Sequence, residues 1–330
     1  MLLGNSKPNQ LPLVSIICLC YNHEKYVAEA LHSVICQTYP NLELIVIDDA
    51  STDGSRAVIQ EFTSIYPEIK FIPFSKNVGN CTAFNVGLQL SKGQYLIDFA
   101  TDDLMYPKRI EKQVELLEKK GAAFGVAFSD ADMIDAQGNK LKTYYKRDKQ
   151  GKIVSKIPEG NVYLHLIKRQ FICTPTMMIR RQVMEQIGGY DEDLVYEDYD
   201  FWVRSGSLFN YAFSDEILTA KRILPTSHGN NFYDQKAKPY LESTLKVCLK
   251  ALQINKTKSE NKALAVSVRY HFRLSLFTQN FEVGQQFWRL LKKMEKISLV
   301  DFFTFLLISL RVPLLRVYRR YRVIKILRHV

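Results

Sequence analysis

The sequence lacks the patterns that mark secreted, membrane-spanning and zinc-binding proteins. Residues 1–10 contain no basic stretch followed by an apolar one, so no secretory signal is predicted. No segment reaches about 18 uninterrupted apolar residues, so no transmembrane helix is predicted. The six cysteines form no CxxC pair and show no zinc-ligand spacing, so we expect structural thiols in a reducing compartment. These absences favour a cytoplasmic protein.

The chain also carries little excess positive charge outside its C-terminal end, although its formal net charge is +11. Residues 286–330 hold eleven Lys or Arg against Glu295 and Asp301, which leaves residues 1–285 nearly neutral. A nucleic-acid-binding protein usually carries its positive charge on a face of the folded body. The distribution therefore argues against a nucleic-acid partner.

Strands and helices alternate through the first third of the chain. Continuous apolar runs rich in β-branched residues predict strands buried on both faces, and the amphipathic stretches between them predict helices. Such alternation is typical of right-handed βαβ units, so the predicted fold class is α/β, with a Rossmann-like, mainly parallel sheet flanked by helices. The predicted strands are 14–20, 42–47, 69–74 and 95–99. The predicted helices begin near Asn22, Asp53, Asn80 or Thr82, and Pro107.

The pattern changes in the second half of the sequence. After a further predicted strand at 123–128 the alternation ends, and residues 140–160 are polar and predict an excursion on the surface. Beyond Asn231 the pattern is helical, with little Gly or Pro. We therefore predict an α/β domain over residues 1–230 and a helical C-terminal region over residues 231–330.

Paired aspartates follow two of the four predicted strands, Asp48 and Asp49 after the second and Asp102 and Asp103 after the fourth. In open α/β sheets the ligand binds at the carboxyl ends of the strands. The chain has neither GxGxxG nor GxxxxGK[ST], so a glycine-rich phosphate loop is not predicted. Carboxylates repel a diphosphate but can hold the Mg²⁺ or Mn²⁺ that bridges to it. The pattern therefore predicts a metal–nucleotide site.

The alternative is that these aspartates cap the helices that follow them. We favour capping for Asp53. For Asp102 and Asp103 we favour metal binding, because Pro107 already supplies a helix start.

Several motifs in this order resemble those of an inverting GT-A glycosyltransferase of family 2. The opening segment, VSIICLCYNHEKYVAEALHSVICQTYPNLELIVIDDASTDGS, spans Val14–Ser55. The resemblance covers about residues 12–228 at spacings similar to those of the family. The later motifs are Asn77–Gly79, Asn85–Gly87, Lys92–Tyr95, Thr101–Asp103, Gly188–Glu192 and Glu197–Arg204.

The resemblance implies a role for individual residues. Asp49, or its neighbour Asp48, would contact the nucleotide base, and Asn22 and Asp102 would also bind the nucleotide-diphosphate sugar. Asp102 would hold the divalent metal, with Asp103 adjacent. Asp198 would be the catalytic general base, and Glu197 is the alternative.

Four positions depart from the family pattern or from the strand pattern. Ala100 stands where the first carboxylate of a DxD motif is expected, Leu19 replaces a proline, and Phe84 replaces an arginine that would contact phosphate. Asp98 lies inside the fourth predicted strand and either compensates for Ala100 or pairs with a neighbour.

The implied activity is transfer of a sugar, hexosyltransferase-like and with inversion, to a hydroxyl of a glycan or lipid-linked acceptor, in surface polysaccharide synthesis. A nucleotidyltransferase would be expected to carry a Gly/Lys-rich signature near the first strand, and none is present. A degenerate GT-A domain that binds nucleotide or a partner at the membrane is the alternative. Ala100 and Phe84 favour that alternative, whereas the intact Glu197 and Asp198 argue against it. Arg222 and His228 lie where a loop that contacts phosphate would close, and a solvated turn is the other interpretation.

The C-terminal tail combines apolar and basic residues. Leu299–Leu315 is strongly apolar but contains Asp301 and Arg311, and residues 316–329 interleave Arg and Lys with Val, Tyr, Ile and Leu. A helix of this kind either lies in a membrane interface or packs on the body with a solvated basic face. We favour the membrane surface and expect a peripheral protein at the inner face of the cell membrane.

Overall fold

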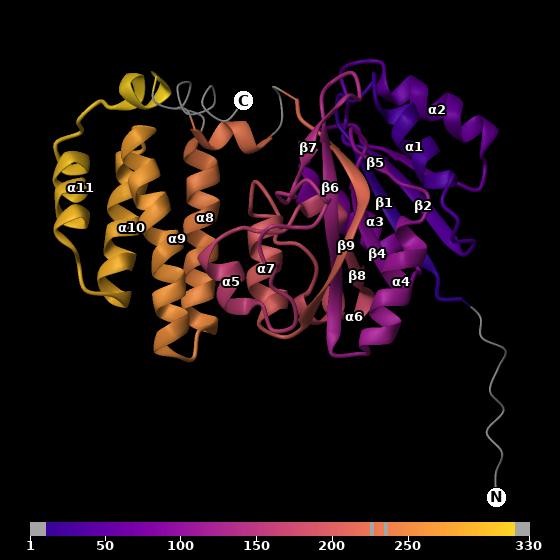
Figure 1. The fold of residues 1–330 in the computed structure, drawn as a ribbon. Helices are drawn as coiled ribbons and strands as arrows, with labels where there is room; N and C mark the ends of the chain where they lie inside the picture. The colour runs from indigo at the N-terminus through magenta and orange to yellow at the C-terminus, as the bar shows by residue number, and fades with distance from the viewer. Residues whose placement is uncertain (1–10, 225–227, 234–236, 321–330) are drawn as a thin grey trace, which may run out of the picture. The chain divides into compact units, whose positions relative to one another are not determined.

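The structure, a computed structural model, describes residues 11–224, 228–233 and 237–320 (Figure 1). The chain forms two compact units, each built from three segments. The first unit comprises Met1–Gly160, Ile172–Tyr190 and Phe209–Ile223, and the second comprises Asn161–Phe171, Asp191–Leu208 and Leu224–Val330. The segments Asn161–Phe171 and Asp191–Leu208, which we placed in the α/β domain, thus pack with the C-terminal helices.

The first unit is built on a nine-stranded sheet within the described residues, with the order β3-β2-β1-β4-β8-β6-β9-β5 and with β7 paired to β6. The pairs β1–β2, β1–β4, β2–β3 and β6–β9 are parallel, which confirms the predicted mainly parallel α/β fold. The strands are β1 (Val14–Cys20), β2 (Leu42–Asp48), β3 (Lys70–Pro73), β4 (Tyr95–Ala100), β5 (Leu104–Met105), β6 (Phe124–Ile134), β7 (Lys140–Thr143), β8 (Met178–Arg180) and β9 (Asn210–Arg222).

Helices cover both faces of the parallel strands because β1, between β2 and β4, is apolar on both sides. On one face Cys18 packs in a cluster with Leu31 and Val114. On the other face a Cβ on Gly87 would lie 2.4 Å from Ile17, so only glycine permits this close approach of helix to strand. The helical segments of this unit are α1 (Val27–Ile35), α2 (Ser55–Ile65), α3 (Asn80–Leu90), α4 (Arg109–Lys120), the 3₁₀ turn η1 (Thr174–Thr176) and α6 (Arg181–Ile187).

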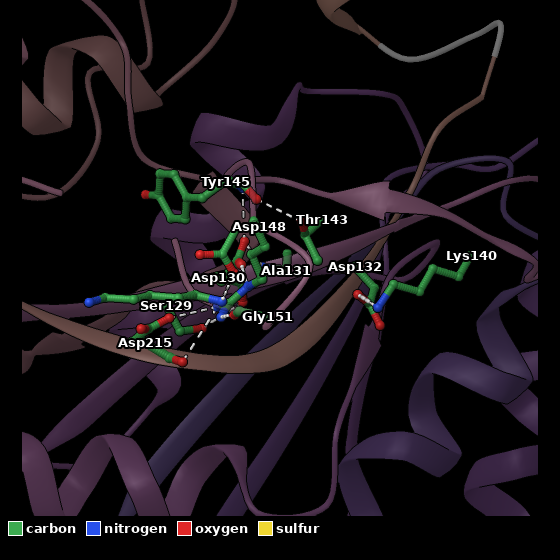
Figure 2. A network of polar contacts seen from close by, with 12 residues as sticks. Ser129, Asp130, Ala131, Asp132, Lys140, Thr143, Tyr145, Asp148, Gly151 and Asp215 are labelled. Carbon is green, nitrogen blue, oxygen red and sulfur yellow. Dashed lines mark hydrogen bonds and ion pairs between the residues drawn. The ribbon is translucent and has the colours of Figure 1, made fainter. Parts of the chain in front are cut away.

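The polar excursion predicted at residues 140–160 includes β7 and is tied to the sheet by a buried ion pair. Asp130 of β6 is fully buried, and its Oδ2 accepts a hydrogen bond of 2.8 Å from Nε of Arg147. A second nitrogen of Arg147 lies 2.7 Å from Asp215 of β9. Figure 2 shows Asp130 and Asp215 in this network, with Tyr145 above them. The network explains why β6 continues to Ile134, six residues past the predicted strand end at residue 128 and into a polar sequence.

The second unit is helical. Its longest helix, α9, begins with a capping box in which Thr257 and Glu260 satisfy each other's backbone amides. Among the described residues we find no helix both long enough and apolar enough to span a membrane. The predicted apolar tail forms a helix over Leu299–Ser309, and residues 315–320 are helical again after a break. Residues 321–330 of the predicted basic stretch lie outside the described residues. The helical segments are α5 (Tyr163–Lys168), α7 (Asp198–Gly206), η2 (His228–Tyr233), α8 (Lys238–Ile254), α9 (Lys258–Phe277), α10 (Phe281–Met294) and α11 (Leu299–Ser309).

Candidate active site

The two aspartate pairs of the first unit lie at the ends of β2 and β4, which lie on either side of β1. Asp48 is the last residue of β2, and Asp102 and Asp103 follow β4. The turn after β1 contacts the segments that follow both strands. The side-chain oxygen of Asn22 accepts a hydrogen bond of 2.8 Å from the amide of Thr52, and Nδ1 of His23 lies 2.9 Å from Oγ1 of Thr101. One turn therefore connects the two acidic segments at the carboxyl edge of the sheet.

The predicted helix start near Asn22 is wrong, because the side chain of Asn22 caps no helix. Helix α1 begins at Val27, and no side chain caps its first turn. Asn22 instead has a left-handed backbone with a φ of 58°, and Ala50, just after the first aspartate pair, has a φ of 59°. Such conformations cost free energy in residues other than glycine and gather at functional sites.

Asp48 and Asp49 are both directed to partners within the protein. Asp48 is fully buried, and its Oδ2 lies 3.0 Å from Nε of Arg56. The carboxylate of Asp49 accepts hydrogen bonds from the amides of Val78 and Gly79, at 2.7 and 2.9 Å. Burial raises the pKa of Asp49 although these two amides oppose the shift. Asp49 thus holds the motif Asn77–Gly79 in place. Its contact with a nucleotide base stays a prediction.

Asp102 and Asp103 differ in how far solvent reaches them. The side chain of Asp102 is 17% exposed, whereas Asp103 is buried and accepts a hydrogen bond of 2.8 Å from the amide of Arg222. Burial, together with the neighbouring charge of Asp102, raises the pKa of Asp103 to about 8. Asp103 is therefore largely protonated at neutral pH, and Asp102 is the member of the pair that a ligand can reach.

Two further residues complete this site, and the sequence analysis missed the role of both. Nε2 of His23 lies 3.9 Å from a carboxylate oxygen of Asp102. Arg222, at the end of β9, is buried, donates from Nε to the carbonyl of Asp102 at 2.9 Å, and reaches Glu29 at 3.0 Å. Arg222 is therefore neither a solvated turn residue nor a free contact for phosphate. The side chain of His228 lies outside the described part of the chain.

Of the two interpretations of Asp98, pairing with a neighbour is what the structure contains. The hydroxyl of Tyr190 donates to Oδ2 of Asp98 at 3.0 Å. Phe84, which stands where an arginine was expected, is fully buried, and its ring centroid lies 4.3 Å from that of Tyr190. Asp98 and Phe84, the two positions that differ from the expected pattern, thus both contact Tyr190 in one packed region between α3, β4 and the segment Gly188–Tyr190.

The donor set suits a metal that arrives with its substrate. No group of three His, Cys, Asp or Glu side chains arranged to hold a metal is found among the residues that the structure describes. Mg²⁺ is usually bound by one or two carboxylates, with substrate phosphates and water supplying the other ligands. Asp102 is reachable and Asp103 lies next to it in the chain, so the pair can supply the one or two carboxylates that such an ion needs.

The predicted catalytic carboxylates, Glu197 and Asp198, belong to the second unit. Asp198 is the first residue of α7 and is half-buried, and Nε2 of Gln170 donates to its Oδ2 at 3.4 Å. Asp200, two residues later, is fully buried and lies within hydrogen-bond distance of Arg204 and of Lys250, at 2.7 Å in each case.

Helix α8 holds the segment that leads to Asp198. The amide of Val195 donates to Oγ of Ser243 at 3.1 Å, and the hydroxyls of Tyr196 and Thr244 lie 2.5 Å apart. Nζ of Lys246 donates to the carbonyl of Asp193 at 3.2 Å. Together with the contacts of Lys250 to Asp191 and Asp200, these bonds fix residues 191–200 along one face of α8.

The chain is similar to glycosyltransferases over most of this length. The model of the glycosyl transferase family 2 matches residues 15–188. A glycosyltransferase of Haemophilus influenzae is 34% identical over 234 residues, which cover 66% of this chain and 67% of that protein. TuaG of Bacillus subtilis, described as a teichuronic acid biosynthesis glycosyltransferase, is 31% identical over 179 residues, covering 54% of this chain and 66% of that protein.

Solved structures show the same fold at lower identity. TarS 1–349 of S. aureus in complex with UDP-GlcNAc is 17% identical, with a TM-score of 0.61, and the match covers 89% of this chain and 78% of that one. The chain spans only 49% of a longer TarS chain. The mannosyltransferase PcManGT of Pyrobaculum calidifontis, in complex with GDP-Man and Mn²⁺, is 15% identical, with a TM-score of 0.55 and coverage of 95% and 84%.

The family model covers more than half of the chain, and it includes both aspartate pairs and the Asn-Val-Gly motif that Asp49 holds. The chain is therefore a glycosyltransferase that belongs to family 2.

Proposed function

We propose that this glycosyltransferase moves a sugar from a nucleotide-diphosphate sugar to a hydroxyl of a glycan or lipid-linked acceptor, with inversion and with a divalent metal. The observation that carries the proposal is the reachable Asp102 beside buried Asp103 at the carboxyl edge of the parallel sheet, because ligands of such sheets bind there. The nucleotide sugars in two structures of the same fold, UDP-GlcNAc and GDP-Man, support this donor class.

Each residue in the proposal has a defined task. Asp102, with Asp103 behind it, would hold Mg²⁺ or Mn²⁺, which when bound neutralises negative charge on the diphosphate leaving group. Asn22, Asp48 and Asp49 would shape the nucleotide pocket through the loops that they hold. Asp198, or alternatively Glu197, would take the proton of the acceptor hydroxyl as that oxygen bonds to the anomeric carbon and the bond from this carbon to the diphosphate breaks.

The acceptor is proposed from the chemistry of the relatives. TuaG is described as acting in teichuronic acid biosynthesis, and this supports a role in surface polysaccharide synthesis for the present chain. A hexose is the proposed donor sugar. Growth of a surface polymer on a lipid carrier would take place at the inner face of the cell membrane, so we also propose that the protein works there as a peripheral protein.

The competing proposal is a degenerate GT-A domain that binds nucleotide or a partner without transfer. Ala100 removes one carboxylate from the metal site, which favours that alternative. The retained Glu197 and Asp198, and the contacts that hold their segment on α8, argue against it, since a non-catalytic domain has no need of an ordered base.

A screen of nucleotide sugars by thermal unfolding, with and without Mg²⁺ or Mn²⁺, tests the proposal. A ligand that binds only the folded protein raises its unfolding temperature. Stabilisation by one UDP- or GDP-sugar that requires the metal, followed by release of the nucleoside diphosphate when acceptor is supplied, is the expected result. Stabilisation without turnover would favour a degenerate domain that binds nucleotide. No response to any nucleotide sugar would contradict transfer and favour a degenerate domain that binds a partner.

A further inference from the structure

Helix α11 and its last turn present several large apolar side chains to solvent instead of to the protein. Leu299, Phe302, Phe303, Leu306 and Leu310 are 78%, 51%, 59%, 42% and 66% exposed. Their spacing of three or four residues places them on one stripe along the helix and its last turn. Surface helices normally bury such a stripe, so we call these five residues the outer stripe of α11.

The opposite side of α11 faces the protein and combines polar and apolar side chains. Asp301 is fully buried, caps its own helix through the amide of Ser298, and accepts a hydrogen bond of 3.1 Å from Nε of Arg269 on α9. Thr304 is buried on the same side. Phe305 stacks on Trp288 of α10 with ring centroids 4.5 Å apart, and α11 packs against α10 and α9 (Figure 1). The orientation is thus fixed, with the acid turned inward and the apolar stripe outward.

The surroundings of the outer stripe are positively charged. Between Lys296 and Arg320 the sequence contains one acid, Asp301, and it is buried. Lys292, Lys293 and Lys296 precede the stripe and are exposed, and Arg316, Arg319 and Arg320 follow it and are exposed. Glu282 of α10, the exposed acid near the end of the stripe, is paired with Arg311 at 2.7 Å. An apolar stripe flanked at both ends by exposed cations is complementary to a surface that has an apolar interior and anionic groups above it.

We propose that the outer stripe of α11 is the membrane-docking surface of this protein, inserted at the boundary between the acyl chains and anionic lipid headgroups. The flanking Lys and Arg side chains contact the phosphates. A second copy of the chain is a poorer occupant, because a two-fold contact through this surface would bring the same cations of both copies together. This inference deepens the membrane part of the proposed function and does not rest on the transferase chemistry.

Vesicle sedimentation with the full chain tests the proposal. The probes are vesicles of phosphatidylcholine alone and vesicles of equal parts phosphatidylcholine and phosphatidylglycerol. We expect the wild type to sediment with the anionic vesicles and to be released by salt, because salt screens the cations. Replacing Leu299, Phe302, Phe303 and Leu306 together by Gln should weaken binding at least about tenfold, since the apolar insertion is lost.

The controls separate docking from folding and from catalysis. Leu208→Gln removes an apolar side chain that is 58% exposed elsewhere in the same unit, and it should leave vesicle binding unchanged. The four-residue variant should unfold at the wild-type temperature, because its replaced side chains are exposed. Equal sedimentation of the four-residue variant and the wild type would overturn the proposal, and so would absence of wild-type binding to either vesicle.

A concentration-dependent dimer that the variant loses, measured by light scattering, would assign the stripe to a second copy instead. Release of nucleoside diphosphate with a soluble acceptor reports on the proposed function separately.

Discussion

Lys250 of α8 bridges two carboxylates of the segment that contains Asp198, because its ammonium group contacts both Asp191 and Asp200 and lies 2.7 Å from Asp200. Asp200 is fully buried, so its charge depends on Lys250 and Arg204 for compensation. The family match ends at residue 188, before this segment begins. A helix outside the matched region therefore determines where the proposed general base is held.

Replacing Lys250 by Met should destabilise the protein by about 1–3 kcal/mol, because it leaves the buried Asp200 with Arg204 as its remaining cation. Urea unfolding measures this loss. If Lys250 also positions Asp198, the rate of transfer should fall while the KM for the nucleotide sugar stays constant, and Lys250→Arg should restore part of the rate. Lys246→Met is the matched control on the same helix, since Lys246 contacts a backbone carbonyl of this segment. A transfer rate for Lys250→Met equal to that of the wild type would show that the bridge is structural alone.

Asp198→Asn should abolish most of the transfer and leave nucleotide binding intact. The amide cannot accept the proton of the acceptor hydroxyl, and general-base assistance typically contributes about 10²–10⁴-fold. Single-turnover assays measure the rate, and calorimetry measures the affinity for nucleotide. Glu197→Gln is the matched neighbour and should retain most of the activity. The reverse pattern in the two variants would transfer the role of base to Glu197.

The sequence predicts the parallel half of the fold well because its strands are buried on both faces. Val14–Cys20 is apolar except for Ser15, and Leu42–Ile47 is apolar except for Glu43; such runs have few structural alternatives. The acidic ends of these strands were also predictable, since a carboxylate directly after a buried strand must lie at the sheet edge. The end of β6 was not predictable, because Asp130 and Asp132 are polar residues that usually mark the end of a buried strand. The cation that compensates the charge of Asp130 is Arg147, which lies seventeen residues further along the chain.

The partners of the candidate site were harder to predict because they are distant in the sequence. Arg222 reaches Asp102 across 120 residues, and Lys250 reaches Asp200 across 50. A single Arg or Lys in an amphipathic stretch is usually predicted to be solvated, and no periodic pattern in the sequence indicates that it is buried. His23 gave no signal either, since the histidines show no metal-ligand spacing and its neighbour Thr101 is 78 residues away.

Arg222→Lys should destabilise the first unit by about 2–4 kcal/mol, because an ammonium group cannot replace the planar fork that serves the carbonyls of Asp102 and Asp135 and the carboxylate of Glu29. It should also weaken metal-dependent nucleotide binding, since the turn that carries Asp102 loses its support. Urea unfolding and calorimetry with UDP and Mn²⁺ check the two effects. Arg289→Lys, at an exposed position on α10, should change neither quantity. Unchanged stability in Arg222→Lys would mean that the turn is held by the backbone alone.

His271 of α9 should make the stability of the second unit depend on pH. Burial of the ring, which stacks near Phe287, lowers the pKa of His271 to about 4, although the contact of Nδ1 with the carbonyl of Ser267 at 2.9 Å opposes the shift. In the unfolded chain the histidine takes up a proton near pH 6.5, so the unfolded state binds more protons between pH 6.5 and about 4. The free energy of unfolding should therefore fall as the pH drops through this range, by about 1–3 kcal/mol.

His271→Gln removes this titration and provides the measurement. Urea unfolding at a series of pH values should give a difference in stability between wild type and variant that is constant above pH 7, where the ring is neutral in both states. Below pH 6.5 the difference should shift in favour of the variant, because the wild type alone must keep a neutral imidazole against protonation. Parallel pH profiles for the two proteins down to pH 4 would show that the ring is protonated in the folded state, and the buried neutral histidine would then be excluded.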